Sequence, residues 1–225
     1  TDATTGVITL EDKDNPSSLT ITGQGTLNIT ANSGINAIAG QGSVINIEDG
    51  TIKANSGIGG LESTVTVSGG NITIDDEKGC TACIGNGKSV SISGESTNIT
   101  LKNPSVGIDA DDIDIVESEI NITYGADYTK SGTGITYSNS LEMSDCKYVI
   151  TEKRSEVKAT GISANAGTAE ISNCKMDMLV RDGISIKGST LSIEKTEINI
   201  NALQYPIVAT STEVSANSYL SLKST

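Results

Sequence analysis

The stretch GISIKGSTLSIEKTEINI, residues 183–200, decides the fold of this protein. It holds three short runs in which two apolar residues flank one outward residue: Ile184–Ile186, Leu191–Ile193 and Ile198–Ile200. Strict alternation over a short run is the period of a β-strand. Small or polar residues separate the runs, so the stretch is interpreted as one turn of a coil with three sides.

The same turn recurs along almost the whole chain. A Gly-Ile pair heads most turns, and Cys83-Ile84 and Pro206-Ile207 occupy the two remaining heads. The Gly-Ile pairs begin at Gly34, Gly57, Gly107, Gly134, Gly161 and Gly183, and successive heads are 22–27 residues apart. A period of this size is typical of solenoid proteins.

Two further sets of apolar pairs follow each head. The second strand of each turn is predicted from Leu19/Ile21, Ile45/Ile47, Val65/Val67, Val90/Ile92, Ile113/Ile115, Leu141/Met143, Ala169/Ile171 and Leu191/Ile193. The third strand is predicted from Leu27/Ile29, Ile52/Ala54, Ile72/Ile74, Ile99/Leu101, Ile120/Ile122, Tyr148/Ile150, Met176/Met178 and Ile198/Ile200.

These patterns predict an all-β fold: a right-handed, single-stranded parallel β-helix of about eight to nine coils, with 22–27 residues and three strands per coil. Stacked turns should place each apolar residue about 4.8 Å from its counterpart one turn earlier. Residues 1–225 are expected to form a single β-helix domain. The ending SLKST leaves open that the chain is a fragment of a longer surface protein.

The connections between strands fall into two classes. From the second to the third strand the spacing is nearly constant, as from Ile47 to Ile52 and from Ile193 to Ile198. This constant corner is rich in Gly, Asp and Asn, which tolerate positive φ. From the third strand to the next head the length varies, and the longer connections lie between residues 75 and 160. Insertions on one side of a solenoid are where binding sites usually lie, so we expect a functional surface along this variable edge.

The composition argues against several classes of function. A formal net charge of -13 leaves no basic stripe to neutralise phosphates, so no nucleic-acid partner is expected. No apolar run is long enough to span a bilayer. The chain has no His, the commonest general base, and no Trp or Phe, the strongest sugar-stacking residues together with Tyr.

The Gly-Ile heads and the paired strands of STVTVSGGNITI and STLSIEKTEINI resemble the right-handed parallel β-helix of the pectin-lyase-like superfamily. They also resemble the Gly/Ser/Thr-rich repeat proteins of Gram-positive bacterial cell surfaces. The resemblance covers roughly residues 5–222 and implies a secreted, extracellular protein at the cell surface. The resemblance is specific for the fold and weak for the function, because one fold hosts many activities.

The resemblance also implies two kinds of catalytic site, and this sequence departs from both. Polygalacturonase-like members carry a Gly-His-Gly stretch, whereas the similar segment RDGISIKGS at residues 181–189 has no His. Pectate-lyase-like members use calcium-binding carboxylates and an Arg base. Here Arg154 and Arg181 lie on different turns, and neither sits in a matching motif. We therefore expect no enzymatic activity.

The segment GIDADDIDI holds the candidate metal ligands Asp109, Asp111 and Asp112. Paired carboxylates near a strand corner can hold Ca²⁺, which takes six to eight oxygen ligands. The alternative is a solvated acidic corner without a cofactor, and it is favoured because no Asp-x-Asp-x-Asp-Gly loop is present. Asp75, Asp76 and Glu77 on the variable edge form a second, weaker candidate.

The four cysteines fall into two pairs. Cys80 and Cys83 form a C-x-x-C motif in a loop, but a zinc site would need a second pair or a His. A local disulfide or two free thiols are therefore expected there. Cys146 and Cys174 occupy the same corner position on neighbouring turns, so both are expected to point inward and stack as structural cysteines. Reduced stacking is favoured over a disulfide across the turns, although bridged Cα atoms lie about 4.4–6.8 Å apart, which a ladder step allows.

Three tyrosines and one carboxylate are the candidate ligand-binding residues. Tyr124 and Tyr128 are expected in the longest edge loop, where their rings can stack on a sugar, and Tyr137 follows on the next first strand. Asp109 completes the set. The alternative is that the rings cover apolar gaps of the loop itself.

The expected function is that of a non-catalytic extracellular β-helical protein, an adhesin or stalk module at the cell surface. Its partner would be a glycan or a host or cell-surface protein. The alternative is a glycan-binding module that uses the variable edge between residues 75 and 160. A polysaccharide lyase or hydrolase is the third possibility. A glycan-binding assay separates the first two functions, and release of sugar products would indicate the third.

Overall fold

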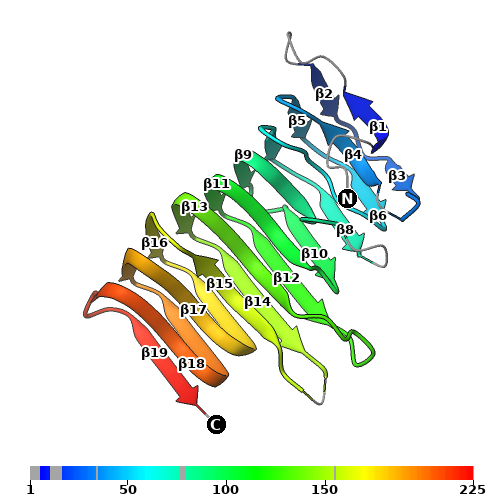
Figure 1. Ribbon diagram of the computed structural model, residues 1–225. Coiled ribbons are helices and arrows are strands. Elements are labelled where there is room, and N and C mark those ends of the chain that lie inside the picture. The colour runs from blue at the N-terminus through cyan, green and yellow to red at the C-terminus, as the bar shows by residue number, and fades with distance from the viewer. Residues whose placement is uncertain (1–5, 11–16, 34, 77–79, 155, 225) are drawn as a thin grey trace.

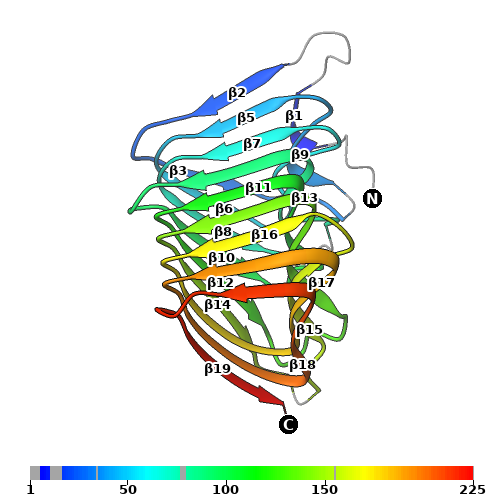
Figure 2. The same ribbon diagram turned by 90° about the vertical axis from the view of Figure 1, so that its left-hand side faces the viewer.

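The computed structural model describes residues 6–10, 17–33, 35–76, 80–154 and 156–224. Gly34 and Glu77, which the sequence patterns single out, lie outside these ranges. The described residues form strands and turns and no helix, and the strands stack in parallel as a β-solenoid of about 8 turns (Figures 1 and 2). The predicted all-β, parallel, coiled fold is confirmed.

Each turn has three sides. The first side carries β1 (Gly6–Leu10), β4 (Asn36–Gly40) and β15 (Ala159–Ala164). The second side carries β2 (Ser18–Ile21), β5 (Val44–Ile47), β7 (Thr64–Val67) and β16 (Thr168–Ser172). The third side carries β3 (Thr26–Ile29), β6 (Thr51–Ala54), β8 (Asn71–Asp75), β10 (Asn98–Lys102), β12 (Glu119–Tyr124), β14 (Lys147–Glu152) and β19 (Tyr219–Ser224).

Five longer strands bend around corners. The strands β9 (Ile84–Ser93), β11 (Val106–Val116) and β13 (Gly132–Ser144) continue from the first side to the second. The strands β17 (Lys175–Glu194) and β18 (Glu197–Val214) continue through all three sides. Register shifts mark the bends, as between Ala110 and Asp112 in β11. A bulge of this kind bends a strand and re-aims its side chains.

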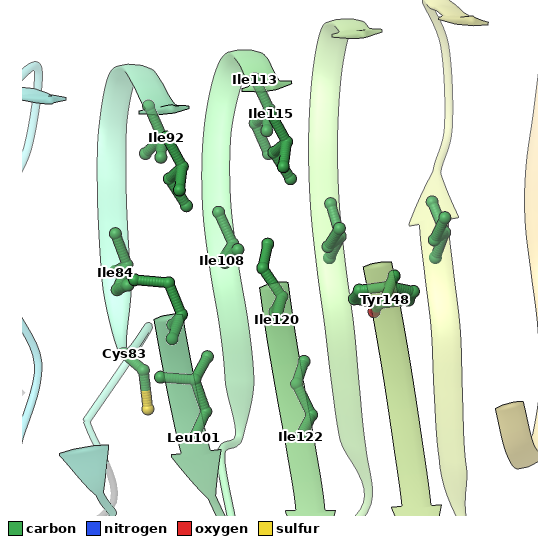
Figure 3. Packing of buried hydrophobic residues seen from close by; sticks show 14 of the residues in the cluster. Cys83, Ile84, Ile92, Leu101, Ile108, Ile113, Ile115, Ile120, Ile122 and Tyr148 are labelled. Atoms are coloured by element: carbon green, nitrogen blue, oxygen red, sulfur yellow. The ribbon is translucent and has the colours of Figure 1, made fainter. Parts of the chain in front are cut away.

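The predicted ladders of the second and third strands are confirmed in register. On the second side Ile113 pairs with Val90 and with Leu141. On the third side Ile120 pairs with Ile99 and with Tyr148. Aliphatic side chains therefore stack on like side chains along the axis, and they fill the interior between the three sides (Figure 3).

The first ladder begins differently from the prediction. The sequence spacing placed Ile35 one turn before Ile58, but Ile58 bridges to Ile38 and to Ile84. Ile38 also pairs with Ile8 of β1. The register is held by Asn36, whose buried carboxamide donates a hydrogen bond of 3.2 Å to the Gly59 carbonyl. The repeat spacing of the Gly-Ile pairs does not reveal a hydrogen bond made by a single side chain.

The constant corner has a left-handed residue in every described turn except the last, between Val214 and Tyr219. In the later turns these are Glu117 (φ 50°), Asp145 (φ 54°), Asn173 (φ 51°) and Lys195 (φ 48°). Earlier turns use glycine, as at Gly50 (φ 93°) and Gly70 (φ 88°). Asn, Asp and Gly adopt this conformation most readily.

In the four later turns, the residue after the left-handed position points inward. These residues are Ser118, Cys146, Cys174 and Thr196, and all are buried. Their backbones continue the parallel ladder, since the N–H of Lys147 donates to the Ser118 carbonyl and the N–H of Lys175 to the Cys146 carbonyl, each at 2.9 Å. The two cysteines thus occupy the places that Ser and Thr fill in the adjacent turns.

Candidate functional site

A hollow runs along the corner between the first and second sides. It has a volume of ≈ 850 Å³, and its polar lining includes Asn86, Lys88, Asp109, Asp111, Tyr137 and Asn165. We call it the first-corner groove. The groove brings together Asp109, Asp111 and Tyr137 of the predicted ligand-binding and metal residues. It does not lie on the variable edge, where the sequence predicted the functional surface.

Small residues create this groove. In the ladder that follows the stacked isoleucines, Gly87 pairs with Ala110, Ala110 pairs with Tyr137, and Tyr137 pairs with Ala164. Gly87 lies so close to the previous turn that an added Cβ would meet the Gly60 carbonyl oxygen at 2.6 Å. One large ring is therefore flanked by small residues above and below, which leaves the corner hollow.

Tyr137 is buried in the floor of the groove with 2% of its surface exposed. Its hydroxyl oxygen is buried and forms no hydrogen bond with the described residues. Desolvation raises the pKa of Tyr137 to about 12, so the phenol keeps its proton at neutral pH. A buried hydroxyl without a partner costs free energy unless it finds one. The buried ring therefore lines the floor of the groove and offers no face for stacking.

The predicted calcium ligands do not converge on one point. Asp111 is exposed and accepts a hydrogen bond from Ser138. Asp112 accepts hydrogen bonds of 2.6 Å from Asn139 and from Ser140 on the next turn. Their carboxylates are thus used in side-chain ladders along the axis.

Asp109 differs from its two neighbours because it is half-buried in the groove. Burial raises its pKa, and the charge of Asp111 raises it further. A carboxyl group with a raised pKa in a cleft is a candidate functional group. The Asp75 carboxylate of the second predicted metal cluster instead pairs with Lys102 at 3.2 Å.

The structure corrects the predicted position of Tyr124. Its ring is fully buried, because β12 extends by one alternation and places Tyr124 inward after Ile120 and Ile122. The ring packs so tightly that a Cβ added at Gly132 would meet it at 2.3 Å. Tyr128 is partly buried, with its ring centroid 5.8 Å from that of Tyr124. Neither ring forms an open platform for a sugar at this edge.

A buried ion pair closes the variable edge. The side chains of Glu152 and Arg154 are 0% and 4% exposed and form an ion pair. Arg154 also lies 5.1 Å from the ring centroid of Tyr124 and 5.3 Å from that of Tyr128. It donates further hydrogen bonds to the carbonyls of Tyr128 and Lys130. The guanidinium therefore fastens the loop after β12 to the loop after β14.

The Glu152 carboxylate orders its own loop as well. Its Oε2 atom accepts hydrogen bonds from the N–H groups of Lys158 at 3.3 Å and Ala159 at 3.2 Å. The hydrogen bond to Glu152 raises the pKa of Arg154. Sequence reasoning missed this pair, because nothing in the spacing of Glu152 and Arg154 distinguishes them from surface charges.

The two cysteine pairs occupy different environments. Cys146 and Cys174 are buried at the constant corner with their Sγ atoms 3.0 Å apart, and both are free thiols. Their hydrogen bond and their burial raise the pKa of Cys146. The predicted inward stacking of these cysteines is confirmed.

Cys80 and Cys83 are buried at the variable edge, with their Sγ atoms 3.8 Å apart. Asp76 joins them there. Among the described residues, these three side chains form the group of possible metal ligands whose donor atoms all lie within 4.8 Å of one another. Asp109, Asp111 and Asp112 are not part of such a group.

Comparisons with known proteins found no match: no protein-family model, no curated protein and no solved structure matches this chain. Within the described ranges, no helix has the length and apolar character that crossing a membrane requires.

Proposed function

We propose that this protein is a non-catalytic extracellular module, a stalk or adhesin segment at the cell surface. The observation that carries the proposal is the ladder of parallel strands, which follows all three sides of the coil through most of its length. Each turn is hydrogen-bonded to the next along its strands, and the interior is packed with aliphatic side chains. An extended, regular body of this kind suits a spacer that must keep its length.

The environment of the two arginines supports a non-catalytic role. Both arginines are held in ion pairs, Arg154 with Glu152 and Arg181 with Asp182 at 2.7 Å. Neither guanidinium is therefore positioned as the free base that a lyase of the pectin-lyase-like kind would need. The likeness to that superfamily and to Gram-positive surface repeat proteins belongs to this proposal, and the three-sided parallel coil supports it.

Surface labelling tests the proposed location. An antibody raised against the purified chain should stain intact cells of the source organism, and external protease should remove that staining. Staining that requires broken cells would contradict the proposal. A cytoplasmic marker probed in the same samples controls for leakage.

Glycan binding in the first-corner groove is the second candidate function. Tyr137 supports it specifically, because it lines a groove of carboxylates and carboxamides and its buried hydroxyl forms no hydrogen bond with the described residues. Sugar hydroxyls are suited to such a lining, since each can donate and accept hydrogen bonds. The site differs from the variable edge on which the sequence placed it.

A glycan array with matched variants tests this second function. Asp109→Asn and Tyr137→Phe should each abolish or strongly weaken a hit, because they remove groups that line the groove. Glu142→Gln is the control, since Glu142 is an exposed carboxylate on the second side. A hit that is lost equally in Glu142→Gln, or no hit at all, would argue against the groove as a glycan site. Release of sugar fragments would instead favour a polysaccharide lyase or hydrolase.

A further inference from the structure

Asp76, Cys80 and Cys83 form a compact buried group at the variable edge. Asp76 directly follows β8, and Cys83 directly precedes β9. Their exposed fractions are 4% for Asp76, 2% for Cys80 and 0% for Cys83. Two thiols and a carboxylate from one connection are thus gathered in the interior, where a charged group needs a counterion or hydrogen bonds.

The spacing of the donor atoms fits a tetrahedral metal ion. Two thiolates at a Zn–S distance of about 2.3 Å and a tetrahedral angle lie about 3.8 Å apart. The Sγ atoms of Cys80 and Cys83 are 3.8 Å apart. The carboxylate of Asp76 has an oxygen within 4.8 Å of both sulfur atoms, a separation that a small adjustment of the side chain closes to the ligand distance.

The backbone holds the three residues in place. The N–H of Asp76 donates to the Lys102 carbonyl and the N–H of Cys83 to the Val106 carbonyl, both at 2.9 Å on the next turn. The Asp76 carboxylate also accepts a hydrogen bond of 2.9 Å from the N–H of Cys80. Hydrogen bonds that orient ligands before the metal arrives raise affinity. The solenoid ladder therefore holds Asp76 and Cys83, and Asp76 in turn holds Cys80.

The charges of the proposed ligands suit a divalent cation. Two thiolates and one carboxylate carry three negative charges, and a bound divalent ion stabilises thiolates, as thiolate-bound metals do.

One member of the group lies at a surface hollow. The hollow, of ≈ 340 Å³, is lined by Asp76, Asn103, Tyr128 and Lys130, among others. Asp76 is thus shared between the buried group and this hollow, and we expect an ion to enter on the side of Asp76.

We propose that Asp76, Cys80 and Cys83 bind one thiophilic divalent cation, with Zn²⁺ as the ion that best fits two thiolates and one carboxylate. Soft thiolate ligands in a tetrahedral arrangement select zinc over calcium or magnesium. Binding forms two metal–sulfur bonds and one metal–oxygen bond, and the two thiol protons leave to solvent. The site ties the end of β8 to the start of β9, and it is independent of the proposed surface function.

Cobalt substitution tests the proposal on the full chain. The reduced, chelator-treated protein is titrated with Co²⁺, and one equivalent should produce the visible bands of tetrahedral cobalt with a thiolate-to-cobalt charge-transfer band. Zn²⁺ should displace the cobalt and remove both signals. Zn²⁺ should also protect two of the four thiols from a thiol reagent in the folded protein.

Variants locate the site. Cys80→Ser and Cys83→Ser should lose the charge-transfer band at one equivalent. Asp76→Asn should weaken Co²⁺ binding by at least the ~10–100-fold that loss of even a supporting partner costs at such sites. Cys146→Ser and Cys174→Ser are the matched controls and should keep the signal, because these cysteines replace Ser and Thr at the constant corner.

Three outcomes would overturn the proposal. The first is a folded, reduced protein, with the strand signal in circular dichroism, that shows no tetrahedral cobalt spectrum. The second is a spectrum that the Cys146→Ser and Cys174→Ser variants abolish instead. The third is a Cys80–Cys83 disulfide in the native protein that re-forms in air in the presence of excess Zn²⁺.

Discussion

The constant corner and the variable edge connect the same three-sided coil by opposite means. In four later turns of the constant corner, two residues make the connection: one in the left-handed conformation and one with a small buried side chain, as at Asn173 and Cys174. At the variable edge, longer loops are joined by side chains, above all by Arg154 and Glu152. In a repeat protein, backbone geometry can thus maintain the shape of one corner, while another corner varies in length and is stabilised by specific side-chain contacts.

The difference has a consequence for what sequence can vary. A corner made by backbone geometry needs a residue that adopts the left-handed conformation. It needs no side-chain contact with neighbouring turns, only the backbone hydrogen bonds of the ladder. An edge made by side chains depends on particular partners from different turns, such as Arg154 above the ring of Tyr124. We expect the constant corner to tolerate substitution by residues that adopt the left-handed conformation. We expect the variable edge to tolerate changes in the length of its loops.

Insertion of one residue should produce the largest contrast. A Gly inserted between Asn173 and Cys174 would shift β17 by one residue and turn Met176 and Met178 outward, since a one-residue slip moves every side chain to the other face. Exposing two such core residues at ~2–5 kcal/mol each should unfold the later turns. A Gly inserted between the exposed residues Ala126 and Asp127 should cost less than ~1 kcal/mol.

Urea unfolding followed by far-UV circular dichroism measures both insertions, and limited proteolysis maps the turns that are lost. Equal losses of stability from the two insertions would refute the distinction between the two regions. An insertion at the edge that is worse than one at the corner would reverse it.

Removing one carboxylate from each region tests the ion pairs. Glu152→Ala leaves Arg154 buried without its partner and should cost ~3–5 kcal/mol. Glu119→Ala at the constant corner removes an exposed pair with Lys147 and should cost less than ~1 kcal/mol.

The double variant Glu152→Leu with Arg154→Met is the internal control, because removing both charges avoids the unpaired guanidinium. It should recover much of the stability that Glu152→Ala loses in urea unfolding. Failure of the double variant to recover any stability would show that the edge depends on the hydrogen bonds to the loop carbonyls rather than on charge balance.

A smaller effect is expected from the left-handed residue itself. Asn173→Val places a β-branched residue at φ 51° and should cost ~1–2 kcal/mol. Asn173→Gly should stay within ~0.5 kcal/mol of the parent, because glycine adopts this conformation without strain. Thermal unfolding of the two variants side by side provides the measurement. A valine variant as stable as the glycine variant would rule out backbone conformation as the basis of this corner.

The smallest effects should appear as opposite pH dependences. The pKa of Asp109 is raised by burial, so the folded state holds this proton more tightly than the unfolded state. Its ionisation therefore lowers stability as pH rises through the ordinary Asp pKa and the raised one, and Asp109→Asn should stabilise slightly at neutral pH.

Glu119 should show the reverse. Its hydrogen bond from Lys147 lowers its pKa, so its contribution is present above the ordinary Glu pKa and is lost as pH falls through the lowered one. Glu119→Gln should therefore destabilise slightly at neutral pH and have no effect in acid. Melting temperatures of both variants between acid and neutral pH test the pair, and the same sign for both would contradict the assigned causes.

The ladders could be predicted from sequence because alternation is a local property. The pairs that contain Ile113 and Ile120 identify inward residues without any knowledge of their neighbours. The same alternation extends through Ile122 to Tyr124, and following it one step further would have placed that ring in the core. The error came from assigning the residue to the loop instead of the strand.

The candidate sites were less predictable because they depend on register between turns. The first-corner groove exists because Ala110, Tyr137 and Ala164 fall in one ladder, just before the register between β11 and β13 shifts. The group of Asp76, Cys80 and Cys83 depends on how one connection folds inward. The sequence motifs of zinc sites supply a second cysteine pair or a His as the remaining ligands. They therefore do not identify the carboxylate of Asp76, which lies seven residues before Cys83.

The distribution of tyrosine gives the molecule built-in optical reporters. Without Trp or Phe, its near-ultraviolet circular dichroism and its intrinsic emission arise mainly from six tyrosines. Tyr124, Tyr137 and Tyr148 are immobilised in the middle turns, whereas Tyr205 and Tyr219 are exposed in the last part of the coil. Loss of the near-ultraviolet signal should therefore time the melting of the central turns alone, while far-ultraviolet dichroism follows the whole chain.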